Sequence, residues 1–208
     1  MPDFSALGAF FAAAFLLNIA PGPDMLYVIG RSIGQGRRAG TVSALGVFVG
    51  CLVHIFVAAV GLAALLRSSP LAYSIVRYAG AAYLVYLGVR VLLERSNNLE
   101  MPEVQSAPLG RIFTQGVITN VLNPKVALFF LAFLPQFIQP QRGSVALQII
   151  VLGLIFDVGG TLVNLAVAQA GGRLGDAIKR HSGLARLQKW FTGTVFIGLG
   201  MRVALKRS

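Results

Sequence analysis

Residues 4–23 read FSALGAFFAAAFLLNIAPGP, a run of 20 residues without a charged side chain that ends on two prolines around a glycine. A helix needs about 20 apolar residues to cross a bilayer, so the run predicts a membrane-spanning segment. Each proline lacks an N–H donor and clashes with the helical turn before it. We therefore predict that this span is broken at Pro21-Gly22-Pro23 and that a half-helix restarts near Pro23.

Five further apolar runs follow along the chain. Ala39–Leu66, Ile112–Ile138 and Ser144–Gly172 are long, whereas Tyr78–Val89 and Trp190–Met201 are shorter and flanked by basic residues whose side chains reach the interface. The sequence is 56% hydrophobic and 12% charged, while soluble domains carry about 25% charged residues. We predict an all-α integral membrane protein with six transmembrane helices.

The fourth of the six runs, Ile112–Ile138, contains a second break, at Asn123-Pro124-Lys125. Asparagine before proline is typical of a helix start, with asparagine as the N-cap and proline in the first turn. Lys125 stands at the middle of the run, where an unpaired lysine costs a few kcal/mol. We therefore expect it to pair with Asp24 or Asp157, either as a structural salt bridge or as part of a substrate site.

An internal similarity divides the chain into two halves. The matched stretches are, in order, Pro21 with Pro124, Gly50–His54 with Gly160–Asn164, and Arg77–Arg90 with Lys189–Arg202. Three matches in one order indicate a tandem duplication, and a duplicated three-helix unit inserts in two opposite orientations. We predict one transporter domain over residues 1–208, built from two inverted three-helix repeats at 1–93 and 111–208 with a linker at 94–110.

The basic residues predict the orientation in the membrane. Of the 18 lysines and arginines, 11 fall on the side of the first, third and fifth links, including Arg31, Arg37 and Arg38, and 6 on the other side, with Lys125 inside the membrane. The positive-inside rule therefore places both termini outside the cytoplasm. Because the charges are spread over short links, we expect no nucleic-acid binding.

Asp24 and Asp157 are the only acidic side chains in the apolar runs, and intramembrane carboxyl groups commonly carry protons. We expect one of the two to couple transport to protons, with Asp157 preferred. The broken first span offers free amides and a positive dipole end that attract a carboxylate; its alternative interpretation is a plain helix start near the interface. His54 is either a hydrogen-bonded packing residue or a proton relay.

The motif Asn-x-x-Pro-Gly-Pro at residues 18–23 occurs together with Asn-Pro-Lys at 123–125 and a glycine-rich last span. On these motifs the whole chain resembles the LysE/RhtB family of bacterial amino-acid exporters. The resemblance implies efflux of amino acids across the bacterial inner (plasma) membrane by proton antiport, in a homo-oligomer. Ala20 departs from the family pattern, because many members have asparagine or threonine there, and this bears on substrate choice.

We therefore predict a secondary transporter that exports small neutral amino acids, such as threonine or homoserine, by proton antiport. The alternatives are an exporter of basic amino acids or of another small solute and, more distantly, an intramembrane enzyme. We expect no enzyme activity, because the sequence has no His-Glu-x-x-His or Gly-x-Ser-x-Gly motif and a thiol relay would need a second cysteine beside Cys51. We also expect no cofactor, and no metal site, because clusters of histidine and cysteine are absent. The expected partners are the amino acid, protons and the lipid bilayer. The residues expected to bind substrate are Asn18, Pro21, Gly22, Pro23, Asn120, Asn123, Pro124 and Lys125, and those expected to couple protons are Asp157 and Asp24.

Overall fold

The computed structural model describes residues 4–68, 70–93 and 105–180, with six single residues between 190 and 201. All regular elements in this part of the chain are helical, as predicted. The α-helices are α1 (Phe4–Ile19), α2 (Pro23–Gln35), α3 (Arg37–Ser68), α4 (Pro70–Leu93), α5 (Leu109–Val121), α6 (Pro124–Leu128) and α7 (Val145–Arg180). Between α6 and α7 lie a π-helical turn η1 (Phe129–Phe133) and two 3₁₀ turns, η2 (Leu134–Phe137) and η3 (Pro140–Arg142).

Within the residues that the structure describes, four segments are long and apolar enough to cross a membrane when each bent pair is taken as one span. Arg37–Gly61 of α3 and Val145–Gly171 of α7 are continuous helices. The other two are bent pairs: α1 with α2 at 45°, and α5 with Pro124–Phe137 at 43°. The chain is therefore a multi-pass helical membrane protein whose two breaks fall at the predicted motifs. Beyond its span, α7 continues to Arg180, so the predicted link after residue 172 begins as helix.

The predicted third span corresponds to α4, a helix of 24 residues. At a rise of about 1.5 Å per residue it reaches about 36 Å, which is enough for a bilayer core. The predicted sixth span, Trp190–Met201, lies mostly outside the described residues. Of its described residues, Gly193 packs against Gly88 of α4.

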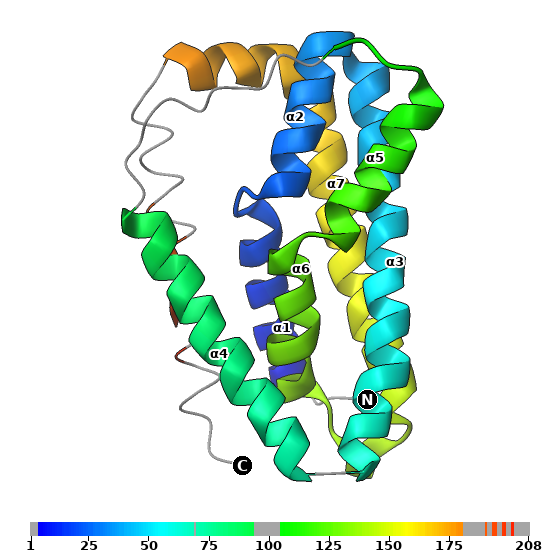
Figure 1. The fold of residues 1–208 in the computed structure, drawn as a ribbon, viewed down its shortest axis with the longest axis vertical. Helices are drawn as coiled ribbons and strands as arrows, with labels where there is room; N and C mark the ends of the chain where they lie inside the picture. The colour runs from blue at the N-terminus through cyan, green and yellow to red at the C-terminus, as the bar shows by residue number, and fades with distance from the viewer. Residues whose placement is uncertain are drawn as a thin grey trace.

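The two bent pairs run in opposite directions (Figure 1). The α1–α2 pair rises from the N-terminal end of the bundle, and the α5–α6 pair descends toward that end, with α3 and α7 alongside. Glycines bring these helices close: a Cβ atom at Gly46 of α3 would overlap the carbonyl oxygen of Phe113 in α5, and one at Gly116 of α5 would lie 2.8 Å from the carbonyl oxygen of Ser43. Close packing of α3 on α5 therefore requires glycine at both positions.

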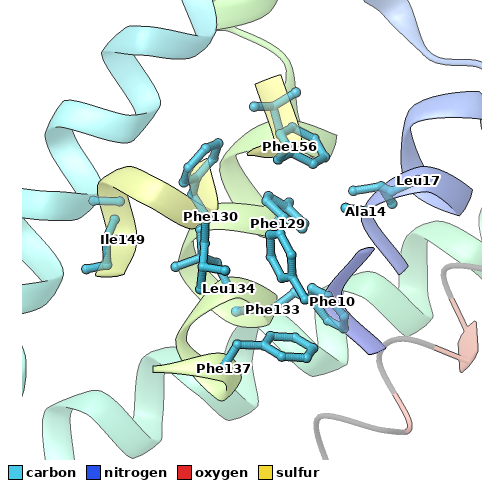
Figure 2. Close-up of a cluster of buried hydrophobic side chains, with 14 of the residues drawn as sticks. Phe10, Ala14, Leu17, Phe129, Phe130, Phe133, Leu134, Phe137, Ile149 and Phe156 are labelled. Carbon is cyan, nitrogen blue, oxygen red and sulfur yellow. The ribbon is translucent and has the colours of Figure 1, made fainter. Parts of the chain in front are cut away.

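An aromatic cluster joins α1 to the second half of the α5–α6 span (Figure 2). Its rings come from Phe10 in α1, Phe129 and Phe133 in η1, Phe137 in η2, and Phe156 in α7. Phe129 stacks on Phe156 with ring centroids 3.9 Å apart, and Phe10 meets Phe137 edge to face at 5.2 Å. The cluster packs these elements together on the N-terminal side of the two breaks.

Candidate functional site

The break in the first span is held by a side chain from the other bent pair. Pro21 has no N–H, so the carbonyl oxygen of Leu17, four residues earlier, loses its helical partner. The Lys125 ammonium supplies one, donating to the carbonyl oxygens of Leu17 at 3.2 Å and Ala20 at 2.8 Å. A cation at a helix C-terminus is also favoured by the helix dipole. Gly22 makes room, because a Cβ atom there would lie 3.1 Å from Lys125 Nζ.

In the second bent pair, too, a proline leaves a backbone carbonyl without its helical donor, and a side chain from another helix supplies the hydrogen bond. Pro124 deprives the carbonyl oxygen of Asn120 of its helical N–H, and that oxygen accepts instead from the Asn123 backbone N–H at 2.9 Å and from His54 Nε2 at 3.0 Å. Asn123 is the N-cap of α6, as predicted, since its Oδ1 accepts from the backbone N–H of Lys125 at 2.9 Å. His54 also stacks on Phe130, so it packs and hydrogen-bonds at the break.

The first turn of α2 is in turn held by amides of the second break. Asp24 is 7% exposed, and its Oδ2 accepts from Asn120 Nδ2 at 2.9 Å and from Asn123 Nδ2 at 2.7 Å. The contacts are reciprocal. Lys125, which follows the second break, donates to carbonyls of the first break, and Asp24, which follows the first break, accepts from side-chain amides of the second. The two breaks therefore form one polar centre.

A cavity of about 30 Å³ lies beside this centre, between the two bent pairs, α3 and α7. Of the residues predicted to bind substrate or couple protons, five line it: Asn18, Asn120, Lys125, Asp24 and Asp157. The other five serve the breaks without lining the cavity: Asn123 caps α6, Gly22 makes room for Lys125, and Pro21, Pro23 and Pro124 shape the backbone. Its apolar lining includes Val47, Val126 and Phe156.

Four polar atoms of the cavity lining are buried without a hydrogen-bond partner. They are Asp24 Oδ1, Asn120 Oδ1, Asp157 Oδ2 and Thr161 Oγ1. Each such atom costs about 1–3 kcal/mol. Carboxylate and amide oxygens accept hydrogen bonds and do not donate them, so the centre suits a ligand with several N–H donors, such as an ammonium group. The cavity holds about two waters, so a larger ligand requires the spans to separate.

The expected direct ion pair of Lys125 differs from the observed contacts. Among the described residues, the hydrogen-bond partners of the ammonium are the two carbonyls of the first break, and neither Asp24 nor Asp157 lies within salt-bridge distance of it. The reason lies in the packing of the two bent pairs, which brings Lys125 next to the carbonyl that Pro21 leaves without a helical partner. Asp157 has the Cys51 thiol as its hydrogen-bonding neighbour instead. In the described part of the chain, no three histidine, cysteine or acidic side chains gather as a metal site.

Asn18 ties the first span to α7. Its Nδ2 donates to the carbonyl oxygen of Phe156 at 3.0 Å, and a Cβ atom at Gly160 would lie 2.9 Å from its Oδ1. Asn164 lines the cavity, whereas Gln169 is exposed and bonds to Thr41.

The sequence reasoning missed a second polar cluster. Arg31 was counted with the link charges, but it lies within α2 and is 7% exposed. Its Nη atoms donate to Gln35 and Gln115, and the hydroxyl of Tyr27 donates to the carbonyl oxygen of Ile112 at 2.7 Å. The i, i+4 spacing of Tyr27, Arg31 and Gln35, which places them on one face of a helix, was the available signal.

Known proteins resemble this chain over nearly its whole length. The leucine efflux protein of Salmonella typhimurium is 29% identical over 200 residues, which cover 96% of this chain and 94% of the relative. The leucine efflux protein of an Enterobacter species is 30% identical over 198 residues, covering 94% and 93%. An uncharacterised membrane protein of Pseudomonas aeruginosa is 32% identical over 191 residues, covering 89% and 88%. No solved structure matches the chain. The family model of the LysE type translocator matches residues 15–207, and the chain therefore belongs to the LysE type translocator family.

Proposed function

We propose that this chain is a secondary transporter that exports neutral amino acids from the cytoplasm. The observation that carries the proposal is the composition of the small cavity, whose lining holds one ammonium group, Lys125, together with unpartnered carboxylate oxygens of Asp24 and Asp157. This arrangement complements a zwitterion. The names of the relatives, leucine efflux proteins, point to the same class of substrate.

In the proposed binding mode, the substrate ammonium donates to Asp24 Oδ1 and Asp157 Oδ2. The substrate carboxylate accepts hydrogen bonds from the Lys125 ammonium, which then leaves the two carbonyls of the first break. The carboxylate also accepts from the free backbone amides in the first turn of α2. The lysine thus exchanges one set of acceptors for another, which limits the cost of moving a buried charge. A bound substrate weakens the contact between the breaks, and this links binding to movement of the spans.

Alternating access follows from two inverted halves that rock about the centre. Two contacts support this arrangement: Gly50 of α3 packs against Asn120 of the second bent pair, and Gly160 of α7 packs against Asn18 of the first. The matched glycines thus contact asparagines of the opposite repeat. We further propose that the chain lies in the bacterial inner membrane with both termini periplasmic, as a homo-oligomer, and that protons drive export through Asp157.

The lining of the cavity favours an aliphatic substrate side chain over a basic one. Val47, Val126 and Phe156 are apolar, and both acidic residues are engaged by the substrate ammonium in the proposed mode. A cationic side chain would require a further carboxylate among them. Leucine therefore fits better than lysine, with threonine and homoserine as smaller neutral candidates.

The test is counterflow of radiolabelled leucine, threonine and lysine in proteoliposomes. We expect exchange of leucine above the smaller neutral amino acids and little exchange of lysine. Lys125→Ala should lower exchange about 30-fold or more, which corresponds to about 2 kcal/mol for a lost buried charge contact. Leu122→Ala, on an exposed side chain of the same span, is the matched control and should exchange normally. Absence of exchange with every amino acid would refute the proposal.

A further inference from the structure

A second, larger hollow of about 760 Å³ lies between α2 and α5, next to residues 105–107. It is separated from the buried cavity by the seam between the two helices. Pro23 and Thr119 line the hollow, while the next residues along the chain, Asp24 and Asn120, line the cavity. We call this hollow the vestibule. Its volume lies in the range of about 300–1,000 Å³ that small-molecule sites occupy.

Arg31 is the buried cation of the vestibule. Its hydrogen bonds go to neutral acceptors: Nη1 to Gln35 Oε1 at 2.6 Å and to the carbonyl oxygen of Gln105 at 3.0 Å, and Nη2 to Gln115 Oε1 at 2.6 Å. Its Nε is buried without a partner. None of these acceptors carries a negative charge. A buried charge of this kind is costly unless it is paired, so the site calls for an anion.

The rest of the vestibule wall suits an aliphatic group. Leu26 and Ile118 are partly exposed apolar side chains that line it from α2 and α5, together with Pro23 and Ala107. Arg111 is a second, exposed cation of the lining. A guanidinium binds a carboxylate through two parallel hydrogen bonds, and an apolar wall beside it accepts the side chain. The chemistry is that of an aliphatic carboxylate.

We propose that the vestibule is an access site, where the carboxylate of the amino acid binds Arg31 before the substrate reaches the buried cavity. The proposal rests on the export function above and adds a second site to it. The vestibule lies at the end of the bundle that carries the Arg31, Arg37 and Arg38 charges, which the positive-inside rule assigns to the cytoplasm. The bonds of Arg31 and Tyr27 across to α5 close the seam, and a carboxylate that takes Arg31 from Gln115 loosens it.

The two sites recognise different groups of the substrate, so probes that lack one of the groups distinguish binding at one site from binding at the other. The buried centre needs the substrate ammonium, whereas the vestibule needs the carboxylate. The probes are 4-methylpentanoate, which is leucine without its amino group, and isoamylamine, which is leucine without its carboxylate. Cysteines are introduced as Ile118→Cys, in the vestibule, and as the matched control Leu122→Cys, exposed one turn later at the C-cap of α5 and outside the vestibule. Native Cys51 is 2% exposed and remains in place.

The measurement is the rate of maleimide labelling of purified protein with and without each probe. At about four times the dissociation constant, leucine and 4-methylpentanoate should slow labelling of Ile118→Cys about five-fold, because only the free fraction reacts. Isoamylamine should not slow it, and Leu122→Cys should label at one rate throughout. Adding Arg31→Gln to Ile118→Cys should abolish the protection.

Three results would overturn the proposal: equal protection of both cysteines, protection by the amine as well as by the carboxylate, or no protection at all. The comparison of probes uses the protein with Arg31 in place, so it does not depend on the stability of the Arg31→Gln protein. Counterflow of leucine in the same preparation reports on the export function separately. Counterflow without protection leaves export standing and removes the vestibule site. Protection without counterflow refutes the access role, because a bound carboxylate would then lead to no transport.

Discussion

At the scale of the residue, Pro21 and Pro124 each leave a backbone carbonyl without its helical donor, and a side chain distant in the sequence supplies the missing hydrogen bond. Pro21 frees the carbonyl of Leu17 for Lys125, and Pro124 frees the carbonyl of Asn120 for His54. The polar centre is thus a consequence of missing backbone donors as much as of polar side chains. This explains why the prolines matter although they do not line the cavity.

Gly22 tests this dependence. Its backbone φ of −156° is an extended conformation that any residue adopts, so the effect of Gly22→Ala comes from space alone. The added Cβ would lie 3.1 Å from Lys125 Nζ and 3.3 Å from its Cε. We expect the lysine to shift by a few tenths of an ångström and leucine counterflow to fall about ten-fold, equivalent to about 1.4 kcal/mol. Gly8→Ala in α1, with no atom within 4 Å of the new Cβ, should transport normally; equal counterflow in both variants would contradict the prediction.

At the scale of the element, the sequence predicted the breaks well and the contacts between them poorly. Proline and asparagine act within one turn of helix, so their local pattern located the N-cap at Asn123 and the restart at Pro23. The partner of Lys125 depends on which carbonyl lies nearest after packing, and this is a long-range property. The buried position of Arg31 was missed for the same reason, because charge counting treats a helix end as a link.

The glycines of α3 give a test at this scale. A Cβ atom at Gly46 would overlap the Phe113 carbonyl oxygen of α5, and backbone cannot move as a side chain can. Gly46→Ala should therefore destabilise the protein by about 1–3 kcal/mol, seen as a lower midpoint of thermal unfolding in detergent. Gly61→Ala in the same helix, where the new Cβ meets no atom within 4 Å, should unfold at the wild-type temperature or above it. A midpoint for Gly46→Ala as high as that of Gly61→Ala would mean that α3 and α5 pack less closely than described.

At the scale of the whole molecule, the two ends of the bundle are held by different chemistry. The aromatic cluster of Phe10, Phe129 and Phe156 packs its elements together on the N-terminal side of the breaks. At the other end, the seam between α2 and α5 is held by hydrogen bonds of Tyr27 and Arg31. A polar substrate competes with hydrogen bonds more readily than with packed rings. We therefore expect substrate to open the seam, and the aromatic end to part only through movement of whole spans.

We propose that Asp157 couples this movement to protons. It lies on α7 beside the cavity, with Oδ2 unpartnered, and it is the acid not held by the asparagines of the second break. Asp157→Asn keeps the size of the side chain and removes the proton-binding group. Leucine counterflow, which needs no net proton movement, should stay within about five-fold of wild type. Asp24 still accepts from the substrate ammonium, and the asparagine amide oxygen can accept in place of the carboxylate, so the loss is the difference between a charged and a neutral acceptor, about 1 kcal/mol. Leucine transport driven by a pH gradient across the same proteoliposomes should be lost. Gradient-driven transport that survives in Asp157→Asn would assign proton coupling to another group. Loss of both activities together would mean that substrate binding depends on Asp157 far more than the single contact of the proposed binding mode allows.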